Sequence, residues 1–356
     1  PQDEEAANRA SCAFEILKSN RSVRLSPIPD EELPAKGTLG FRVQNYGVLH
    51  WADIYTPRQA LTLASIARLV RLAGENAQKQ VGEARGAVIQ SLLGLCLNRL
   101  IGRVNALCWW RSQADQEKIE VAFSGQTVPM KWDFAEACPL TGGTAGWDDS
   151  YAPPVRAIED LASIGLREGA VVQSNADHHP LPDDAAQAFV TDPPYYDAVP
   201  YAALSDFFYV WLKRTMPTAA AISFSDTLAP KDGECIVDEA SGKDRAYFER
   251  CMAKTMAEGR RILCPSGIGV IVFAHKSTSG WEAQLQAMVD AGWIVTGSWP
   301  IDTEMGTRLR ARDSAALASS VHIVCRPREN AYVDEIGEWR DVLQELPLRI
   351  HEWMPR

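Results

Sequence analysis

The stretch Ala188-Phe-Val-Thr-Asp-Pro-Pro-Tyr195 decides the fold prediction for this chain. Its first four residues favour a buried strand, and Asp192 with two prolines follows directly where that strand must end. Proline cannot continue a central strand, because it has no backbone N–H to donate. In sheets with parallel strands, ligands bind beyond the carboxyl ends of the strands. The candidate catalytic residues are therefore Asp192, Pro193, Pro194 and Tyr195.

This tetrapeptide fits transfer of a methyl group to the exocyclic amine of a nucleobase. Such an amine is a poor nucleophile because its lone pair is delocalised into the ring, and acceptors for its N–H groups favour a reactive, tetrahedral nitrogen. The Asp192 carboxylate can accept one N–H, and the prolines hold the Pro193 carbonyl rigidly as a second acceptor. Tyr195 offers a ring for stacking. A duplex base must be flipped out to reach such a site.

Three aromatic residues downstream are candidates for lining the pocket of a flipped base. They are Tyr196, Tyr201 and Phe207. Ordinary helix packing is the alternative interpretation for each of them.

Predicted strands and helices alternate around this stretch. Strands are expected at Ala170–Gln173, Ala188–Thr191, Ile268–Ala274, Trp293–Trp299 and Val321–Cys325, and helices at Ile158–Ile164, Tyr201–Arg214, Asp244–Leu263 and Gly280–Ala291. The alternation is typical of an α/β fold with a mostly parallel sheet covered on both faces. The last two strands, joined by residues 301 to 320, are expected to form a terminal antiparallel hairpin.

Helical patterns dominate the region before this core. One helix is expected to begin at Pro57 with Thr56 as its N-cap, and a second to cover residues 86 to 104. A phosphate loop lies between a strand and a helix. The glycine run at residues 142 to 146 has no strand before it and no clear helix after it, so its sequence lacks this context. The expected domains are an arm or connector at 1–40, a helical, Trp-rich region at 41–154, the α/β core at 155–327 and a tail at 328–356.

The charge of the chain is unusual for a protein that contacts nucleic acid. Its 36 basic and 46 acidic side chains give a net charge of −10, whereas binding to phosphates relies on Lys and Arg. DNA contact must then be local or shared with another chain. The candidate DNA contacts are His275 and Lys276 after the Ile268–Ala274 strand, and the cluster Arg308, Arg310 and Arg312; a solvated surface is the alternative for both groups.

Other classes of protein are less compatible with the sequence. The eight cysteines are scattered singly, so no metal site is expected. The apolar runs are far shorter than the roughly 20 residues of a membrane span. We therefore expect no membrane partner and a cytoplasmic location.

Several segments of the chain resemble the large prokaryotic adenine-specific DNA methylases that contain a zinc ribbon. These segments are Asp192–Arg214, Phe273–Trp281, Trp299–Glu304, Trp132–Glu136 and Trp51–Gln59. The resemblance covers roughly residues 41 to 327. It implies a Rossmann-like class I methyltransferase fold, S-adenosyl-L-methionine as methyl donor, and a place in restriction-modification or phage defence.

The resemblance also implies cofactor contacts. Tyr55, Thr56 and Pro57 match an aromatic-Thr-Pro segment that contacts the methionine end of the cofactor, although Thr56 can serve as a helix N-cap as well. Asp177 lies where such enzymes place a polar residue near the cofactor's adenine, with a solvated loop as the alternative. Asp192 borders both the cofactor and the target base.

The chain departs from that family on the cofactor side. The Asp-Pro-Phe segment with its glycine-rich turn, the acidic residue for the ribose and the cysteine pairs of the zinc ribbon have no counterpart in the 356 residues. We expect a missing N-terminal part or a partner chain to supply the cofactor loop, and other phage-defence subunits to be further possible partners. The chain alone is expected to bind the cofactor weakly or not at all.

Three functions stay open at this point. Methylation of adenine N6 in DNA is favoured by Asp at the first position of the tetrapeptide. Methylation of an amine in structured RNA is the second, since related enzymes use the same tetrapeptide. The third is a non-catalytic scaffold or a sensor of methylation state, which the missing cofactor loop favours and the intact tetrapeptide opposes.

Overall fold

The computed structural model describes residues 2–19, 25–113, 117–123, 126–194, 199–274, 278–301 and 320–328, together with residue 344. The chain divides into two compact units. The first comprises Pro1–Val172 and Tyr196–Asp244, and the second comprises Gln173–Tyr195 and Arg245–Arg356. The sequence analysis places residues 155 to 327 in one core, whereas the structure assigns residues up to 172 and the 196–244 segment to the first unit.

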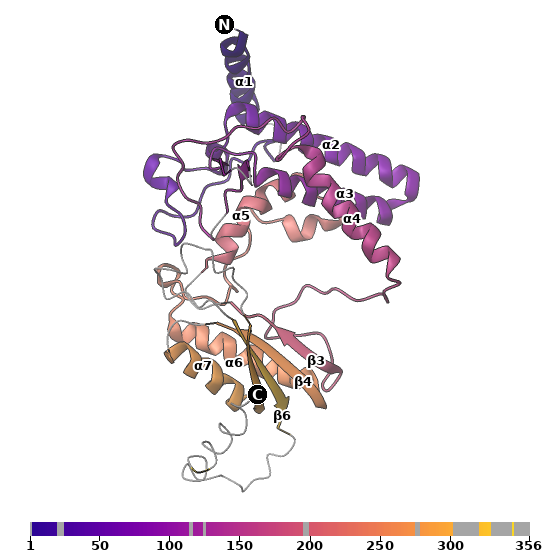
Figure 1. Ribbon diagram of the computed structural model, residues 1–356, viewed down its shortest axis with the longest axis vertical. Helices are drawn as coiled ribbons and strands as arrows, with labels where there is room; N and C mark the ends of the chain where they lie inside the picture. Colours follow the sequence, from indigo (N-terminus) through magenta and orange to yellow (C-terminus); the bar gives the residue numbers. More distant parts are fainter. Residues whose placement is uncertain are drawn as a thin grey trace. The chain divides into compact units, whose positions relative to one another are not determined.

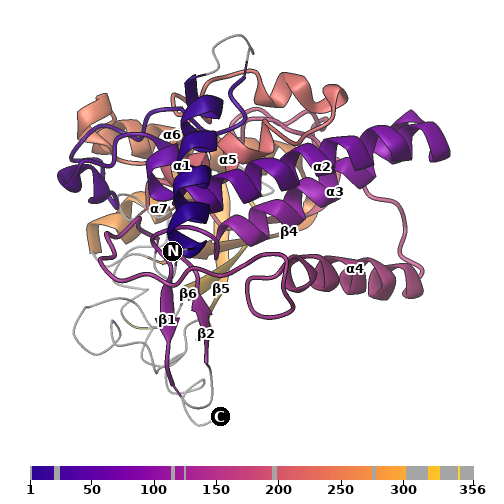
Figure 2. The same cartoon turned by 90° about the horizontal axis from the view of Figure 1, so that it is seen from above.

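The first unit is built mainly from helices (Figures 1 and 2). They are α1 (Gln2–Ser19), α2 (Pro57–Val81), α3 (Glu83–Ile101), α4 (Trp147–Ser163) and α5 (Tyr201–Leu212). The predicted helices after Thr56 and near Gly86 are thus confirmed as α2 and α3. The chain reverses between α2 and α3 at Gly82, whose φ of 90° is open to glycine but costly for other residues.

Short elements complete this unit. They are the 3₁₀ helices η1 (Val43–Tyr46), η2 (Trp51–Ile54), η3 (Thr218–Phe224) and η4 (Glu239–Ser241), and the antiparallel pair β1 (Trp109–Arg111) and β2 (Lys118–Glu120). The core contains Trp51 and Trp211, both completely buried. Phe14 and Ile28 belong to the same core, so residues 1–40 contain packed structure rather than forming only a connector.

The second unit holds a four-stranded sheet in the order β3-β4-β6-β5. Its elements are β3 (Ala186–Thr191), α6 (Arg245–Ile262), β4 (Leu263–Phe273), α7 (Thr278–Asp290), β5 (Trp293–Ile301) and β6 (Ser320–Pro327). β3 and β4 are parallel, while β4–β6 and β5–β6 are antiparallel. The α/β class and the antiparallel pairing of the last two strands are confirmed. The described sheet is mixed, however, rather than mostly parallel.

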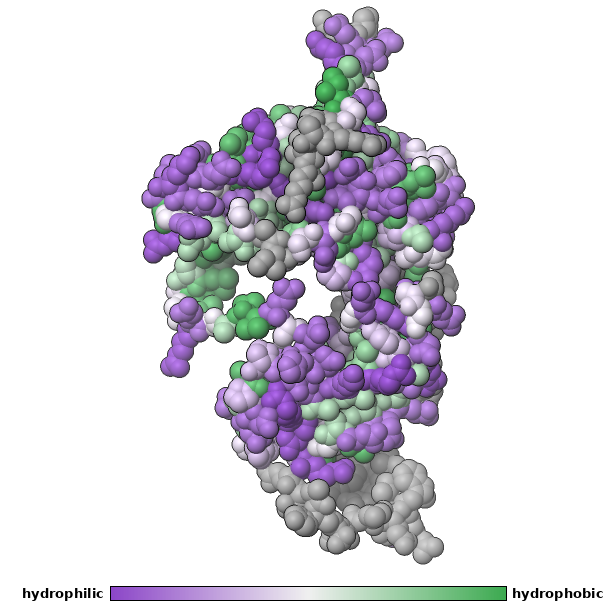
Figure 3. All heavy atoms as spheres, turned by 180° about the vertical axis from the view of Figure 1, so that it is seen from behind, coloured by the Kyte–Doolittle hydropathy of each residue, from purple (hydrophilic) through white to green (hydrophobic). Residues whose placement is uncertain are grey.

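Two expectations before β3 are wrong. Residues 170 to 173 form no strand, and Val171 is 100% exposed, because no strand among the described residues lies beside the segment to pair with it. The glycine run at 142–146 is followed directly by a helix, since α4 begins at Trp147. The end of α4 also exposes Leu161, Ile164 and, just beyond it, Leu166, and Figure 3 shows apolar side chains gathered there.

No helix in the part of the chain that the structure describes combines the length and the apolar character needed to cross a membrane.

Candidate active site

The end of β3 presents the first three residues of the tetrapeptide. Thr191 is paired with Ile271 of the parallel strand β4, and the chain then leaves the sheet at Asp192. Asp192 is exposed, Pro193 is buried and Pro194 is half-buried. The structure therefore places the Asp192 carboxylate where a ligand beyond the strand end could reach it. Tyr195 and Tyr196 lie outside the described residues.

β3 is held firmly against α6 and β5. The Phe189 ring stacks on Trp293, with ring centroids 5.9 Å apart and an interplanar angle of 29°. Trp293 in turn donates its indole N–H to the carbonyl of Met256 on α6, at 2.9 Å. A Cβ added at Gly259 would lie 2.6 Å from the Phe189 ring, so α6 approaches β3 closely at this point. This packing fixes the strand that ends in Asp192.

Asp177 lies in an exposed loop before β3 that is fastened to the end of α6. The backbone N–H of His179 donates to Glu258 at 2.6 Å, and Arg261 donates to the Glu258 carboxylate at 2.7 and 2.8 Å. Arg261 also donates to Asp183 at 2.6 Å. The hydrogen bonds from Arg261 and His179 hold the pKa of Glu258 down to about 2. This network orders the loop, although the strand that Asp177 was expected to follow is not formed.

Helix α5 carries two of the predicted pocket residues, and they differ in exposure. Tyr201 is the first residue of the helix and is about 40% exposed. Phe207 is completely buried, with edge-on contacts to Trp51 and Phe123 at centroid distances of 6.0 and 4.7 Å. For Phe207 the structure supports the alternative interpretation, helix packing. Both residues belong to the first unit.

The aromatic-Thr-Pro segment forms the start of α2. Tyr55 is buried, and its hydroxyl accepts the indole N–H of Trp211 at 2.9 Å. Burial raises the pKa of Tyr55, which stays protonated. Thr56 is the N-cap: its hydroxyl accepts the Gln59 N–H at 3.2 Å, and Gln59 Oε1 accepts the Thr56 N–H at 2.9 Å. Pro57 occupies the first helical position. The predicted N-cap is thus confirmed.

Next to this segment lies an ion pair that the sequence analysis does not single out. Arg58 donates to Glu136 through Nε to Oε1 at 3.2 Å and through Nη2 to Oε2 at 2.8 Å. The Thr56 hydroxyl donates to the same carboxylate at 3.0 Å. The hydrogen bonds and the charge of Glu136 raise the pKa of Arg58. Both partners fall within segments noted for their family resemblance, but their separation of 78 residues gives no local signal that they meet.

A cavity of about 600 Å³ opens beside this pair. It is lined by Ala10, Arg58, Gln59, Leu61, Thr62, Glu136, Ala137, Cys138 and Pro139. Gln59 is only 2% exposed, and its Nε2 has no hydrogen-bond partner within the described structure. The cavity wall therefore combines a cation and an anion, whereas the Nε2 atom of Gln59 is itself buried and is not offered to the cavity.

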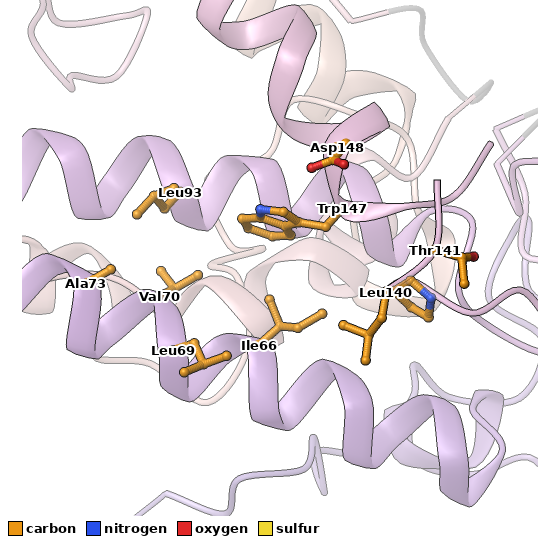
Figure 4. A pocket seen from close by; sticks show the side chains of 10 residues that line it. Ile66, Leu69, Val70, Ala73, Leu93, Leu140, Thr141, Trp147 and Asp148 are labelled. Atoms are coloured by element: carbon orange, nitrogen blue, oxygen red, sulfur yellow. The ribbon is translucent and has the colours of Figure 1, made fainter. Parts of the chain in front are cut away.

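A second cavity, of about 460 Å³, lies between α2, α3 and the start of α4. Figure 4 shows aliphatic side chains of α2 and α3 facing the Trp147 ring, with Asp148 at one side. The walls are mostly apolar, and the first turn of α4 carries Asp148 and Asp149. Acidic residues at a helix N-terminus occupy the position that a phosphate would take, so this cavity does not suit the phosphate role considered for the neighbouring glycine run.

The remaining candidate residues fall in parts of the chain that the structure does not describe. They are His275, Lys276, Arg308, Arg310 and Arg312. Among the residues that are described, no group of three His, Cys, Asp or Glu side chains could hold a metal ion.

Comparison with known proteins adds no assignment. No protein-family model matches the chain, and no curated protein matches it.

Proposed function

We propose that this chain carries the target-base side of an S-adenosyl-L-methionine-dependent DNA methyltransferase that modifies adenine N6. The observation that carries the proposal is Asp192-Pro193-Pro194 at the carboxyl end of β3, a strand paired in parallel with β4. The antiparallel β5–β6 pair at the other side of the sheet is what a class I methyltransferase fold would have there. The resemblance to adenine-specific DNA methylases adds restriction-modification or phage defence as the setting.

The residues of the tetrapeptide would act by positioning and electrostatics. The Asp192 carboxylate and the Pro193 carbonyl would accept the two N–H groups of the target amine. The nitrogen would then be tetrahedral, and its lone pair would no longer be delocalised into the ring. Asp192 is exposed and therefore accessible to a flipped base. Tyr195 would stack on that base, with Tyr196 and Tyr201 as further contacts.

The cofactor would supply a methyl group bound to a positively charged sulfur. Its methionine end would lie at the start of α2, as the family resemblance implies for Tyr55, Thr56 and Pro57, and the cavity lined in part by Arg58 and Glu136 lies next to this segment. Tyr55 and Thr56 contribute there mainly by fixing the helix start, since their side chains are engaged in other hydrogen bonds. Asp177 remains the proposed contact for the adenine end.

The exposed segment at residues 170 to 173 supports the proposal that a further polypeptide segment packs against this chain. Its sequence predicts a buried strand, yet Val171 is fully exposed and unpaired in the structure. Val190 of β3 is also 70% exposed. Parallel strands are normally covered on both faces. We propose that a further polypeptide segment, in the same protein or in a partner chain, covers these residues and supplies the glycine-rich cofactor loop.

The experiment that tests this function is methyl transfer by the protein expressed from its natural reading frame with its neighbouring genes. Tritiated S-adenosyl-L-methionine is supplied with unmethylated duplex DNA, DNA carrying N6-methyladenine, or structured RNA. We expect label only in unmethylated DNA and its loss in Asp192→Ala, while Asp290→Ala, an exposed carboxylate on the same unit, leaves it unchanged. Label in RNA alone, or full activity of Asp192→Ala, would overturn the proposal; DNA binding without any label would favour the scaffold.

A further inference from the structure

Two aromatic rings of the first unit lie together on its surface. Trp132 is 76% exposed and Tyr46 is 52% exposed. Their ring centroids are 5.0 Å apart, and the angle between the ring planes is 83°. Aromatic side chains are mostly buried in folded proteins, because their large apolar area is costly to leave in water. An exposed pair of rings is therefore a candidate binding surface for a flat, apolar group of a ligand.

The segment that carries Trp132 is fastened at both ends. Before the ring, the Val128 N–H donates to the Gly40 carbonyl at 2.8 Å. After it, the Ala135 N–H donates to the Cys108 carbonyl at 3.2 Å. The Trp132 ring thus projects from an ordered backbone, which lowers the entropy that a ligand must remove on binding.

A cation lies directly beside these rings. Lys131 precedes Trp132 in the chain, and its Nζ lies 5.5 Å from the centroid of the Trp109 ring. Trp109 is the first residue of β1 and is half-buried. This cation–π contact holds the ammonium group of Lys131 close to the exposed rings.

The β1–β2 pair adds further positive charge. Side chains alternate along a strand, so Arg111 lies on the same face of β1 as Trp109, and the register places Lys118 and Glu120 opposite them. Glu120 lies 3.4 Å from Arg111 and 3.8 Å from Lys118, so two cations share one carboxylate. Figure 2 shows the two strands side by side, extending away from α2 and α3.

The charge balance of this region differs from that of the whole chain. Three basic side chains, those of Arg111, Lys118 and Lys131, stand against the carboxylates of Glu120 and of the exposed Asp133. The whole chain, in contrast, carries a net charge of −10. A local excess of cations next to exposed rings is complementary to a ligand that combines flat rings with negative charge.

Single-stranded nucleic acid has this chemistry. Its unpaired bases stack on aromatic side chains, and its phosphates are neutralised by Lys and Arg. The core of a protein–protein interface is instead depleted in charged residues. The mixture of rings and cations therefore favours a nucleic-acid strand over a protein partner.

We propose that an aromatic and basic surface of the first unit, the Trp132 surface, binds single-stranded nucleic acid; its residues are Tyr46, Trp109, Arg111, Lys118, Lys131 and Trp132. The rings of Tyr46 and Trp132 stack on unpaired bases. The three cations contact phosphates, and Trp109 positions Lys131. A duplex binds less tightly, because its bases already stack on one another. This inference concerns binding and does not require the methyl transfer proposed at Asp192.

The test is binding of the whole chain, without cofactor, to a fluorescein-labelled oligothymidylate of about twelve nucleotides. Fluorescence anisotropy measures the affinity, and an unlabelled duplex of equal length serves as competitor. We expect Trp132→Ala to weaken binding about tenfold and Trp132→Phe, which keeps a ring, to weaken it clearly less. Trp110→Ala is the matched control, since Trp110 is 51% exposed but lies on the opposite face of β1, and it should bind as the native chain does.

The cations are tested through the salt dependence of binding. For single strands, the logarithm of the binding constant falls with the logarithm of the salt concentration by about 0.7 for each phosphate contact. Lys131→Gln and Lys118→Gln should each reduce this slope by about 0.7. Lys79→Gln, in the last turn of α2, is the control and should leave the slope unchanged.

The outcomes separate this inference from the proposed function. Native affinity of Trp132→Ala, or equal affinity for duplex and single strand, would overturn the Trp132 surface as a stacking site. Absence of any binding to the oligothymidylate would also overturn it, even if the complete enzyme methylates DNA, and would leave the exposed rings to a protein partner. Binding that depends on Trp132 and Lys131 would support the surface even if no methyl transfer is found.

Discussion

The Glu31 carboxylate and the Arg214 guanidinium form a buried ion pair, with Nη1 donating to Oε1 at 2.9 Å and Nη2 to Oε2 at 3.1 Å. Arg214 also donates to the backbone carbonyls of Ser26, Ile28 and Val210. One side chain just beyond α5 thereby fastens the segment that precedes η1. The pair explains why residues 25 to 33 belong to the first unit although their sequence is rich in turn signals.

Glu31→Ala should destabilise the first unit by about 3–5 kcal/mol, because it leaves the buried Arg214 charge without its carboxylate. The measurement is the urea midpoint of unfolding followed by tryptophan fluorescence. Asp30→Ala is the matched control: Asp30 lies 3.4 Å from Arg214 but is exposed, and an exposed pair contributes only about 0–1 kcal/mol. Equal losses in the two variants would show that the buried pair has no special role.

Thr56→Ala should lower the stability of the first unit by about 1 kcal/mol, since it removes the N-cap of α2. Thr56→Ser retains the hydroxyl and should behave nearly as the native chain. Circular dichroism during thermal unfolding measures both. An Ala variant as stable as the Ser variant would mean that the capping box between Thr56 and Gln59 does not stabilise the helix start.

Gly259→Ala should destabilise the second unit, because the new Cβ would lie 2.6 Å from the Phe189 ring. Overpacking costs about 1–3 kcal/mol, against a gain in helix propensity of about 1 kcal/mol. The Trp293 ring prevents Phe189 from moving away easily. Urea unfolding of the variant in the native and Phe189→Leu backgrounds measures the effect. The cost should shrink when the ring is removed, and an unchanged cost would place the strain elsewhere.

The second unit should lose stability in acid through Glu258. Its pKa is about 2 in the folded chain and near 4.3 when unfolded. A depressed folded pKa contributes stability above the unfolded value, and this contribution disappears as the pH falls from about 4.3 toward 2. The urea midpoint measured between pH 6 and 2 should fall more steeply for the native chain than for Glu258→Gln. Parallel curves would show that the contacts with Arg261 and His179 do not stabilise the ionised form.

The sequence by itself determined the local features of this protein. The strand before Asp192, the cap at Thr56, the two long helices and the strands of the β5–β6 pair all follow from residue preferences and side-chain periodicity over a few neighbouring positions. These signals depend on short-range geometry, so they are legible without knowledge of the rest of the chain. The proposal that the Asp192 carboxylate accepts an N–H group of the target amine rests on the same local pattern.

Only the tertiary structure decided which distant residues meet. Glu136 lies against Arg58 and Thr56, Glu31 against Arg214, and Phe207 inside the core; no local pattern encodes these contacts, because they depend on how the whole chain packs. The segment at 170 to 173 shows the reverse case. It has the composition of a strand, but a strand also needs a hydrogen-bonded neighbour, and the described structure provides none there.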